Sequence, residues 1–203
     1  MRALLLIDLQ NDFLPGGALA VPDGDQVIAV ANRAMDSFQH VVATQDWHPA
    51  DHGSFASQHE GVAVGQPIQL DGLPQIAWPD HCVQETPGAE FAADLRTDRI
   101  HHVTRKGTDR MIDSYSGFFD NGHRLPTDLN DFLNSCGVRE LTVMGLATDY
   151  CVKFTVLDAL QLGYSARVVL AGCRGVDLND GDVNVAIDQM RAAGAEITKT
   201  YPE

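Results

Sequence analysis

The 203-residue chain lacks the features that mark several classes of protein. Its N-terminal apolar run, from Ala3 to Ile7, is interrupted by Asp8 and is too short for a signal peptide or a membrane span. Its four cysteines form no C-x-x-C pair, which argues against a disulfide framework and against a cysteine-type zinc site. We therefore predict a cytoplasmic protein with reduced thiols and no membrane partner.

Positive charge is scarce relative to negative charge. Lys and Arg number 14 against 28 Asp and Glu, which gives a formal net charge of −14 at pH 7. Such a balance repels polyphosphate chains and anionic lipid surfaces and favours solubility. We therefore predict that the chain does not bind nucleic acid.

Repeats, low-complexity segments and linkers are also absent from the sequence. A length of 203 residues suits one α/β domain with a sizeable core. We expect residues 1–203 to form a single domain, and both a monomer and a homo-oligomer are compatible with the sequence.

What the sequence does contain is an alternation of β-rich apolar runs with helical patterns. This alternation predicts a mainly parallel sheet with helices on both faces. The predicted strands are Ala3–Asp8, His40–Thr44, Ile100–Arg105, Leu141–Leu146, Arg167–Ala171 and Glu196–Thr198. The predicted helices are Asp25–Phe38, Asp128–Cys136 after the cap candidate Thr127, Asp149–Leu162 and Gly181–Ala193.

One stretch, from Asp46 to Pro87, fits neither pattern. It is crowded with His, Gly, Pro and Gln and shows no sustained period. Structureless loops longer than about 15 residues are uncommon in compact domains unless they serve a purpose. We therefore predict that this stretch is the loop system that builds a site.

Polar residues stand at the ends of four predicted strands. Asp8 closes the first strand, Asp46 follows the second, Lys106 closes the third, and Cys151 comes just after the fourth. In open α/β sheets, ligands bind outside the carboxyl ends of the strands. These four residues are therefore the first candidates for chemistry.

Cys151 lies where an apolar strand breaks at Gly145 and a helical pattern begins near Asp149. A thiol at a helix N-terminus feels the helix dipole and exposed N–H groups, and both favour the nucleophilic thiolate. The alternative is a small buried side chain, which is the commoner state of a free cysteine. We interpret the remaining cysteines as structural: Cys82, Cys136 and Cys173.

Asp8 and Lys106 each have an ordinary explanation beside a catalytic one. Asp8 ends an apolar strand, so its carboxylate needs solvent or a partner, and a turn cap is the alternative. Lys106 is alternatively a solvated surface charge. If both converge on Cys151, the three residues supply a base, a cation that stabilises a thiolate, and a nucleophile.

Histidines gather in the same loop stretch, with four of the eight between positions 48 and 81. Asp46 and His48 are two residues apart, so they point the same way in an extended segment, and His81 can join them from a distant turn. Carboxylate and imidazole ligands suit Zn²⁺, Mn²⁺ or Fe²⁺. These three residues are our candidate metal ligands, and ordinary hydrogen-bonding or surface histidines are the alternative.

Three aromatic residues lie close in sequence to the polar candidates: Phe13, Trp78 and Tyr115. Each has ordinary packing as its alternative explanation. Together they are suited to form walls that stack on a flat ring.

Six segments carry a further signal. In chain order they are LLLIDLQNDFLPGGALAV at 4–21, TQDWHPADHGSFA at 44–56, WPDHCVQ at 78–84, RKG at 105–107, DSYSGF at 113–118 and GLATDYCV at 145–152. Together they resemble the nicotinamidase branch of the isochorismatase-like hydrolase family. They follow the family's order and cover most of the chain, with weaker similarity from Gly61 to Ile76 and at the C-terminus.

The resemblance implies a single-domain, three-layer αβα sandwich. It also gives roles to residues already singled out. The implied catalytic triad is Asp8, Lys106 and Cys151. The implied ligands of one divalent transition metal ion, Zn, Fe or Mn, are Asp46, His48 and His81.

The resemblance further implies details of the site that the residue pattern does not give. The peptide between Leu146 and Ala147 would be cis, a rare geometry for a non-proline pair. The N–H groups of Ala147 and Cys151 would form the oxyanion hole. The positions that line the pyridine pocket in relatives match Phe13, Trp78 and Tyr115.

The chain departs from some relatives at three places. Some members take an additional His or Glu ligand from the loop after the Asp-x-His pair, and His52 is the candidate here. The segment Thr108–Asp113 is longer and more polar than in some relatives. Tyr150 occupies a position where other members carry histidine, so the sequence assigns no role to it.

The activity implied by the resemblance is hydrolysis of nicotinamide, a small-molecule amide, to nicotinate and ammonia through a Cys151 thioester, as a step of NAD salvage. Pyrazinamide is a further expected substrate. Other members of the fold act on isochorismate, ureidoacrylate, N-carbamoyl compounds or biuret, but the candidate metal ligands favour the nicotinamidase branch. A different class of answer is a non-catalytic metal-binding protein, which would bind an ion and release no ammonia.

Overall fold

A six-stranded parallel sheet forms the centre of the protein, as shown by a computed structural model that describes residues 1–201. The strands in spatial order are β5 (His102–Lys106), β2 (His40–Asp46), β1 (Arg2–Ile7), β6 (Glu140–Leu146), β7 (Ser165–Arg174) and β8 (Glu196–Thr198). Every neighbouring pair is parallel. The chain runs outward in one direction from β1 and in the other from β6, so the crevice between these two strands is the expected ligand site.

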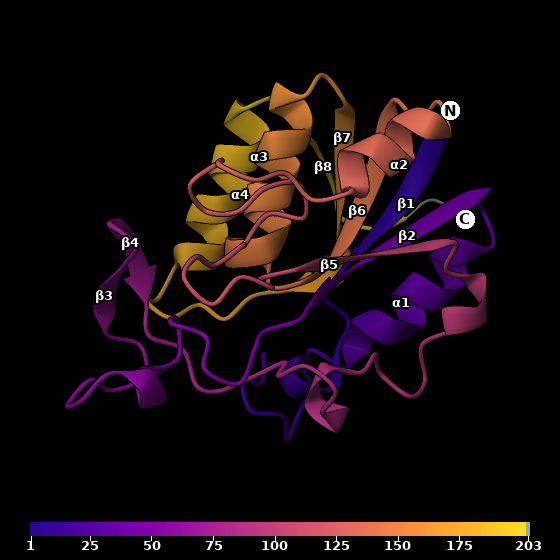
Figure 1. Ribbon diagram of the computed structural model, residues 1–203. Helices are drawn as coiled ribbons and strands as arrows, with labels where there is room; N and C mark the ends of the chain where they lie inside the picture. The colour runs from indigo at the N-terminus through magenta and orange to yellow at the C-terminus, as the bar shows by residue number, and fades with distance from the viewer. Residues whose placement is uncertain (202–203) are drawn as a thin grey trace.

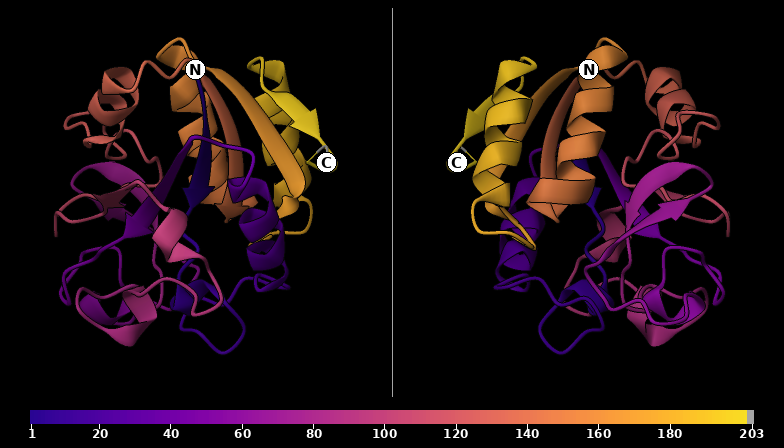
Figure 2. Two further views of the ribbon diagram at one scale, coloured as in Figure 1. Left: turned by 90° about the vertical axis from the view of Figure 1, so that its right-hand side faces the viewer. Right: turned by 90° about the vertical axis from the view of Figure 1, so that its left-hand side faces the viewer.

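Helices cover both faces of this sheet (Figures 1 and 2). Helix α1 (Gln26–Met35) packs on one face, where it contacts β1, β6 and β7. The other face carries α2 (Leu129–Ser135), α3 (Lys153–Gln161) and α4 (Asp182–Ala192). The predicted three-layer αβα sandwich with a parallel central sheet is therefore confirmed.

The central strands are apolar because both of their faces are covered. In β1 every residue from Ala3 to Ile7 is buried, and in β6 every residue from Leu141 to Leu146. Full burial of one Leu or Ile side chain stabilises the fold by about 1.5–3 kcal/mol. The edge strand β5 instead alternates exposed and buried residues and ends on the buried Lys106.

The carboxyl ends of β1 and β6 approach each other very closely. A Cβ at Gly145 would lie 2.2 Å from the carbonyl oxygen of Ile7, and the φ angle of Gly145 is +138°. Only glycine is compatible with both conditions. Asp8, directly after β1, has a φ angle of 49°. The backbone therefore changes direction at the ends of both strands, β1 and β6, at the same point.

Most predicted elements are present with shifted ends. Strand Glu196–Thr198 has the predicted bounds, whereas β7 begins two residues earlier and ends three residues later than predicted. The helix predicted for Asp149–Leu162 is divided into a π-helical turn, Thr148–Val152, and α3. The turn holds Cys151.

The prediction that 46–87 is only a loop system was wrong in part. This stretch contains an antiparallel hairpin of β3 (Pro67–Leu70) and β4 (Leu73–Ile76), which stands apart from the main sheet (Figure 1). Its turn residues Asp71 and Gly72 both have positive φ angles, as a two-residue Asp-Gly hairpin turn requires. Four-residue strands that each contain a proline are too short and too interrupted to show a period of two.

The helices and the cysteines bear on the expectations about membranes and thiols. Among residues 1–201, no helix combines the length and the apolar character that crossing a membrane requires. All four cysteines are free, and three of them are buried: Cys82, Cys151 and Cys173.

Candidate active site

Three of the strand-end candidates meet at the carboxyl edge of the sheet. The Lys106 Nζ atom lies 2.9 Å from Asp8 Oδ2 and 3.3 Å from Cys151 Sγ. All three residues are buried, and the most exposed of them, Cys151, is only 6% exposed. The structure therefore brings together the residues predicted as a catalytic triad, although they come from three different strand ends.

The Lys106 ammonium group is the centre of this cluster. It also donates to Asp46 Oδ1 at 2.6 Å and to the Ser114 carbonyl oxygen at 3.0 Å. Burial opposes the charge, but Asp46, Asp8 and Cys151 outweigh that effect and hold the pKa of Lys106 well above its ordinary value. The site thus contains a permanent buried cation. Removing one partner from such a buried pair costs about 3–5 kcal/mol.

Asp8 has the environment of a general base. Thr44 Oγ1 donates to Asp8 Oδ1 at 2.6 Å, and the Asp8 backbone N–H donates to Thr44 Oγ1 at 3.2 Å. The other oxygen, Oδ2, makes the ion pair with Lys106 but accepts no aligned hydrogen bond within residues 1–201. Burial raises the pKa of Asp8 although Lys106 lowers it. Asp8 Oδ2 therefore has a free lone pair and an increased tendency to take a proton.

The thiol of Cys151 lies beside this base, with a carboxylate oxygen of Asp8 within 4.8 Å of its sulfur. Burial raises the pKa of Cys151 well above its ordinary value, Lys106 lowers it, and Asp8 and Asp46 raise it. The position of Cys151 at a helix terminus was expected to favour the thiolate. Burial and the two carboxylates, by contrast, favour the thiol form of Cys151.

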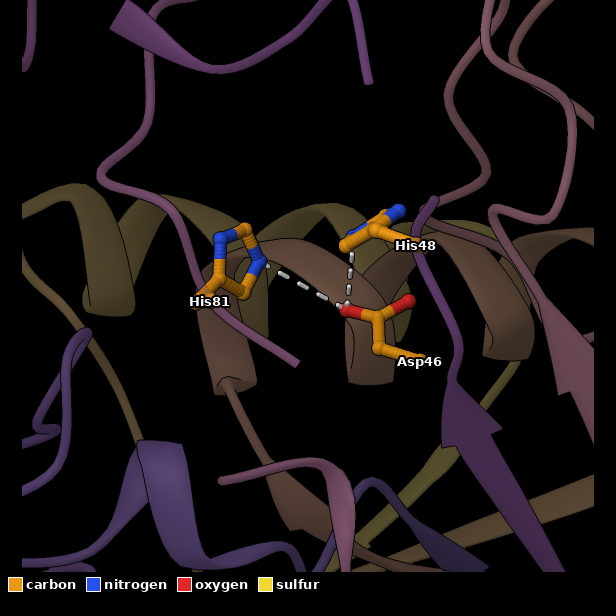
Figure 3. Close-up of side chains that lie close together, drawn as sticks. All are labelled: Asp46, His48 and His81. Carbon is orange, nitrogen blue, oxygen red and sulfur yellow. Dashed lines mark ion pairs between the residues drawn. The ribbon is translucent and has the colours of Figure 1, made fainter. Parts of the chain in front are cut away.

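Asp46, His48 and His81 form a second cluster directly beside the first (Figure 3). The Nε2 atoms of His48 and His81 lie 3.7 Å and 3.9 Å from Asp46 Oδ2. Each Nδ1 atom is engaged by a backbone carbonyl, that of Gly107 for His48 at 2.8 Å and that of Pro79 for His81 at 2.7 Å. Both imidazoles are thereby oriented with Nε2 toward the shared space, which is how metal-binding histidines are held.

The charges of this cluster also suit a cation. Burial and the neighbouring His48 lower the pKa of His81 to about 4, so its Nε2 lone pair is free at neutral pH. Burial opposes ionisation of Asp46, but Lys106 and the two histidines outweigh it and hold the pKa of Asp46 below its ordinary value. For His48, burial is outweighed by Asp46, which raises the pKa, so a bound ion would have to displace a proton from this imidazole. One carboxylate and two imidazoles fit Zn²⁺, Mn²⁺ or Fe²⁺.

His52 lies next to this cluster but belongs to a different group. Its Nδ1 atom is hydrogen-bonded to Ser54 Oγ at 2.7 Å, and its buried Nε2 atom has no partner within residues 1–201. Its ligand atom lies within 4.8 Å of those of His48 and Asp113, rather than of the whole Asp46 and His81 set. His52 as an additional ligand stays a prediction.

A cavity above Cys151 contains the predicted aromatic residues, Phe13, Trp78 and Tyr115. Trp78 Nε1 donates to the Tyr115 hydroxyl oxygen at 3.0 Å, and the Tyr115 hydroxyl donates to Gln75 Oε1. The indole N–H and the phenol O–H are thus both hydrogen-bonded, and both residues line the cavity. The cavity also reaches Asp46, His48 and His81 at its base.

A family model for the Isochorismatase domain matches residues 2–201. The chain belongs to the isochorismatase family. It is 58% identical to a nicotinamidase of Escherichia coli over 200 residues, with 97% of this chain and 93% of that protein covered.

Two solved structures of nicotinamidase and pyrazinamidase enzymes are also similar to this chain. A nicotinamidase-pyrazinamidase of Acinetobacter baumanii has a TM-score of 0.93 at 41% identity, covering 97% of this chain and 94% of that one. A pyrazinamidase of Pyrococcus horikoshii, in complex with zinc, has a TM-score of 0.79 at 37% identity, covering 97% of this chain and 98% of that one.

One backbone feature expected from the family resemblance is present in this isochorismatase-family chain. The peptide between Leu146 and Ala147 is cis. The Ala147 N–H, which lines the cavity next to Cys151, donates no hydrogen bond within residues 1–201. It is therefore available to a ligand.

Several residues of the site were not predicted from the sequence. Leu19 and Val176 line the cavity, and Asp113 lies between its wall and the histidines. Gln75 joins the Tyr115 hydroxyl to Asp113, because its Nε2 atom donates to Asp113 Oδ2. The Asp-Gly pair at 71–72 was the one signal that pointed toward the hairpin that carries Gln75.

Proposed function

We propose that the protein is a nicotinamidase, which hydrolyses nicotinamide to nicotinate and ammonia. The observation that carries this proposal is the contact of Lys106 with both Asp8 and Cys151, beneath an aromatic-lined cavity that ends at a metal-binding cluster. The enzyme class expected from the sequence, an amidohydrolase that acts on a carboxamide, is confirmed by the family and by the nicotinamidase relatives.

The first half of the reaction uses the contacts of Lys106 with Asp8 and Cys151. Cys151 Sγ forms a bond to the carboxamide carbon while its proton passes to Asp8 Oδ2. Lys106, which touches both groups, stabilises the negative charge at each stage. Asp8 then returns the proton to the amide nitrogen, the carbon–nitrogen bond breaks, and ammonia leaves a Cys151 thioester behind.

The second half uses the same groups on a water molecule. Asp8 accepts a proton from the water as its oxygen attacks the thioester carbon. The carbon–sulfur bond breaks, Asp8 returns the proton to the Cys151 sulfur, and the product acid leaves and ionises to nicotinate. In both halves the negative carbonyl oxygen would be stabilised by the N–H groups of Ala147 and Cys151, a type of contact whose loss costs about 10²–10³ in rate.

Asp46, His48 and His81 would hold one divalent ion, with Zn, Fe or Mn as candidates. When bound, the ion supplies a Lewis-acid contact that orients the ring nitrogen of the substrate. Phe13, Trp78 and Tyr115 would stack against the ring and hold the carboxamide over Cys151. Pyrazinamide, which has one more ring nitrogen than nicotinamide, fits the same description.

We further propose that residues 1–203 form one domain and that the protein works in the cytoplasm in NAD salvage. The four free cysteines support a reducing compartment. The net charge of −14 supports a small-molecule partner over nucleic acid or an anionic membrane.

The decisive experiment is an ammonia-release assay over nicotinamide, pyrazinamide, an N-carbamoyl amino acid, ureidoacrylate, biuret and isochorismate, with and without a chelator. For isochorismate, pyruvate release replaces ammonia as the readout. We expect turnover of nicotinamide and pyrazinamide. We also expect the chelator to abolish this turnover. Preferential turnover of any other compound would refute the proposal, and a bound ion without turnover of any compound would indicate a non-catalytic protein.

A further inference from the structure

A second cavity lies directly beside the active-site cavity. It has a volume of about 330 Å³ and lies between the β3–β4 hairpin and the helices α3 and α4. The two cavities share two residues, Tyr115 and Tyr150, whose rings pack edge to face 5.4 Å apart. These two side chains therefore form the wall between the active site and the outer cavity.

The two tyrosines are held in very different ways. The Tyr115 hydroxyl accepts from Trp78 Nε1 and donates to Gln75 Oε1. The Tyr115 ring also stacks on Phe154 at 5.4 Å. Tyr115 is thus fixed by hydrogen bonds at its tip and by ring contacts along its side.

Tyr150 has only ring contacts. Its ring meets Trp78 edge to face at 4.9 Å and Tyr115 at 5.4 Å, and its hydroxyl makes no hydrogen bond within residues 1–201. The side chain is half-buried and directly precedes the Cys151 nucleophile in the chain. Tyr150 is therefore the part of the wall that can be changed without leaving a buried polar group unpaired.

The outer cavity has a mainly apolar lining. Ile76, Phe154 and Val185 contribute apolar surface, and Phe154 and Val185 are 37% and 55% exposed. Lys153 lies with its Nζ atom 4.6 Å from the centre of the Phe154 ring and so covers part of it. Asp149 and Asp182 also line this cavity, so it suits an uncharged aryl or alkyl group and disfavours an anionic one.

We propose that Tyr150 is a specificity-determining residue that limits the substrate to a single unsubstituted ring. The outer cavity is a subsite for a ring substituent, closed to the active site by the Tyr150 side chain. The ligand class it takes is the apolar substituent of an aromatic carboxamide whose amide group reaches Cys151. This inference rests on the proposed function, because it assumes that an aromatic amide occupies the inner cavity.

The test compares nicotinamide with a set of phenylnicotinamides that carry the phenyl group at each free ring carbon in turn. Ammonia release is measured for the wild type, Tyr150→Ala and Tyr150→Val, the latter as a second variant with less loss of packing. We expect the ratio of kcat/KM for at least one phenyl isomer to that for nicotinamide to rise about tenfold or more in both variants.

Two control variants test whether the Tyr150 ring itself sets the size limit. Tyr150→Phe keeps the ring and removes the hydroxyl, and it should leave the ratio unchanged. Phe154→Ala removes a similar aromatic side chain from the outer cavity but leaves the Tyr150 ring in place. Phe154→Ala should also produce no increase in the kcat/KM ratio for any phenyl isomer.

Several outcomes would overturn the inference. Wild-type turnover of a phenyl isomer as efficient as that of nicotinamide would show that the wall sets no limit. An equal increase in Phe154→Ala, or no increase in either Tyr150 variant, would show that another group sets it. Failure of the wild type to hydrolyse nicotinamide would instead refute the proposed function.

Discussion

The two halves of the active-site cavity are built on different physical principles. The polar half, at the strand ends, consists of buried charged and ligating groups held by hydrogen bonds and ion pairs. The aromatic half consists of rings that touch edge to face, with one chain of hydrogen bonds through Tyr115 and with Tyr150 half-buried.

This difference has a consequence for what each half can tolerate. A buried charge that loses its partner has no water to replace it, so the polar half has a single workable arrangement. Ring contacts are short-ranged and non-directional by comparison, so the aromatic half can be reshaped at smaller cost. We therefore expect changes in the polar half to affect the chemical step and metal binding, and changes in the aromatic half to affect which ring binds and how tightly.

The largest effect is expected for Cys151→Ala. Turnover of nicotinamide should fall by about 10³-fold or more, because no other group in the cluster can form the thioester. Nicotinamide binding by calorimetry and metal content by atomic absorption should stay close to the wild type. Cys136→Ala, at a half-buried cysteine outside the site, is the matched control and should retain full activity. Parent-rate ammonia release by Cys151→Ala would show that the reaction is not covalent.

His81→Ala should have the next largest effect, which is a loss of metal affinity. It removes one of three candidate ligands, so metal affinity should fall beyond the ~10–100-fold that loss of an outer hydrogen-bond partner costs. The measurement is a chelator-competition titration together with metal content after dialysis. His59→Ala is the matched control, because His59 lies in the same loop stretch but its Nε2 atom is hydrogen-bonded to the Gly53 carbonyl oxygen. Equal metal loss in both variants would argue against the assigned cluster.

The pH profile of the wild type should show a smaller, graded effect. Asp8 must be ionised to accept the thiol proton, and burial raises its pKa above the ordinary value of about 3.9. kcat/KM should therefore fall as pH is lowered through that raised pKa, by about tenfold per pH unit below it. The profile is measured at saturating metal between neutral pH and pH of about 4. A flat profile down to the ordinary aspartate pKa would exclude Asp8 as the base.

The smallest effect is expected for Gln75→Leu in the aromatic half. Tyr115 loses its acceptor and Asp113 loses a donor, so the Tyr115 ring is held less firmly. A loss of about 1 kcal/mol in ring binding corresponds to about a fivefold rise in KM, while kcat should change little.

The control for this variant is Gln69→Leu, the same substitution on the exposed side of the same hairpin. It should leave both kcat and KM unchanged. A fall in kcat with unchanged KM for Gln75→Leu would link the hairpin to the chemical step. It would contradict the expectation that the aromatic half affects only ring binding.

The strands of the sheet could be predicted well because the central ones are buried on both faces. Runs such as Ala3–Ile7 are apolar throughout, which is the pattern of a covered parallel strand. The ends were less well predicted, as in the π-helical turn at Thr148–Val152, because the residues there respond to the site and not to a repeating pattern.

The hairpin was missed for a different reason. Its strands have four residues each, and Pro67 and Pro74 interrupt them, so local preference opposes the structure that tertiary packing imposes. Gln75 gave no signal of its own, because a glutamine in a polar loop is ordinary until its two partners, Tyr115 and Asp113, are known.

Local sequence was enough to name the main polar groups of the site. A parallel sheet places the carboxyl ends of its strands at one edge, and Asp8, Asp46, Lys106 and Cys151 stand at such ends. How these groups contact one another depends on packing between segments that are distant in the chain. Packing of the strand ends put the Cys151 sulfur in contact with Lys106 and beside Asp8. It also placed Tyr150 between two cavities, because such contacts depend on loops whose path no local pattern specifies.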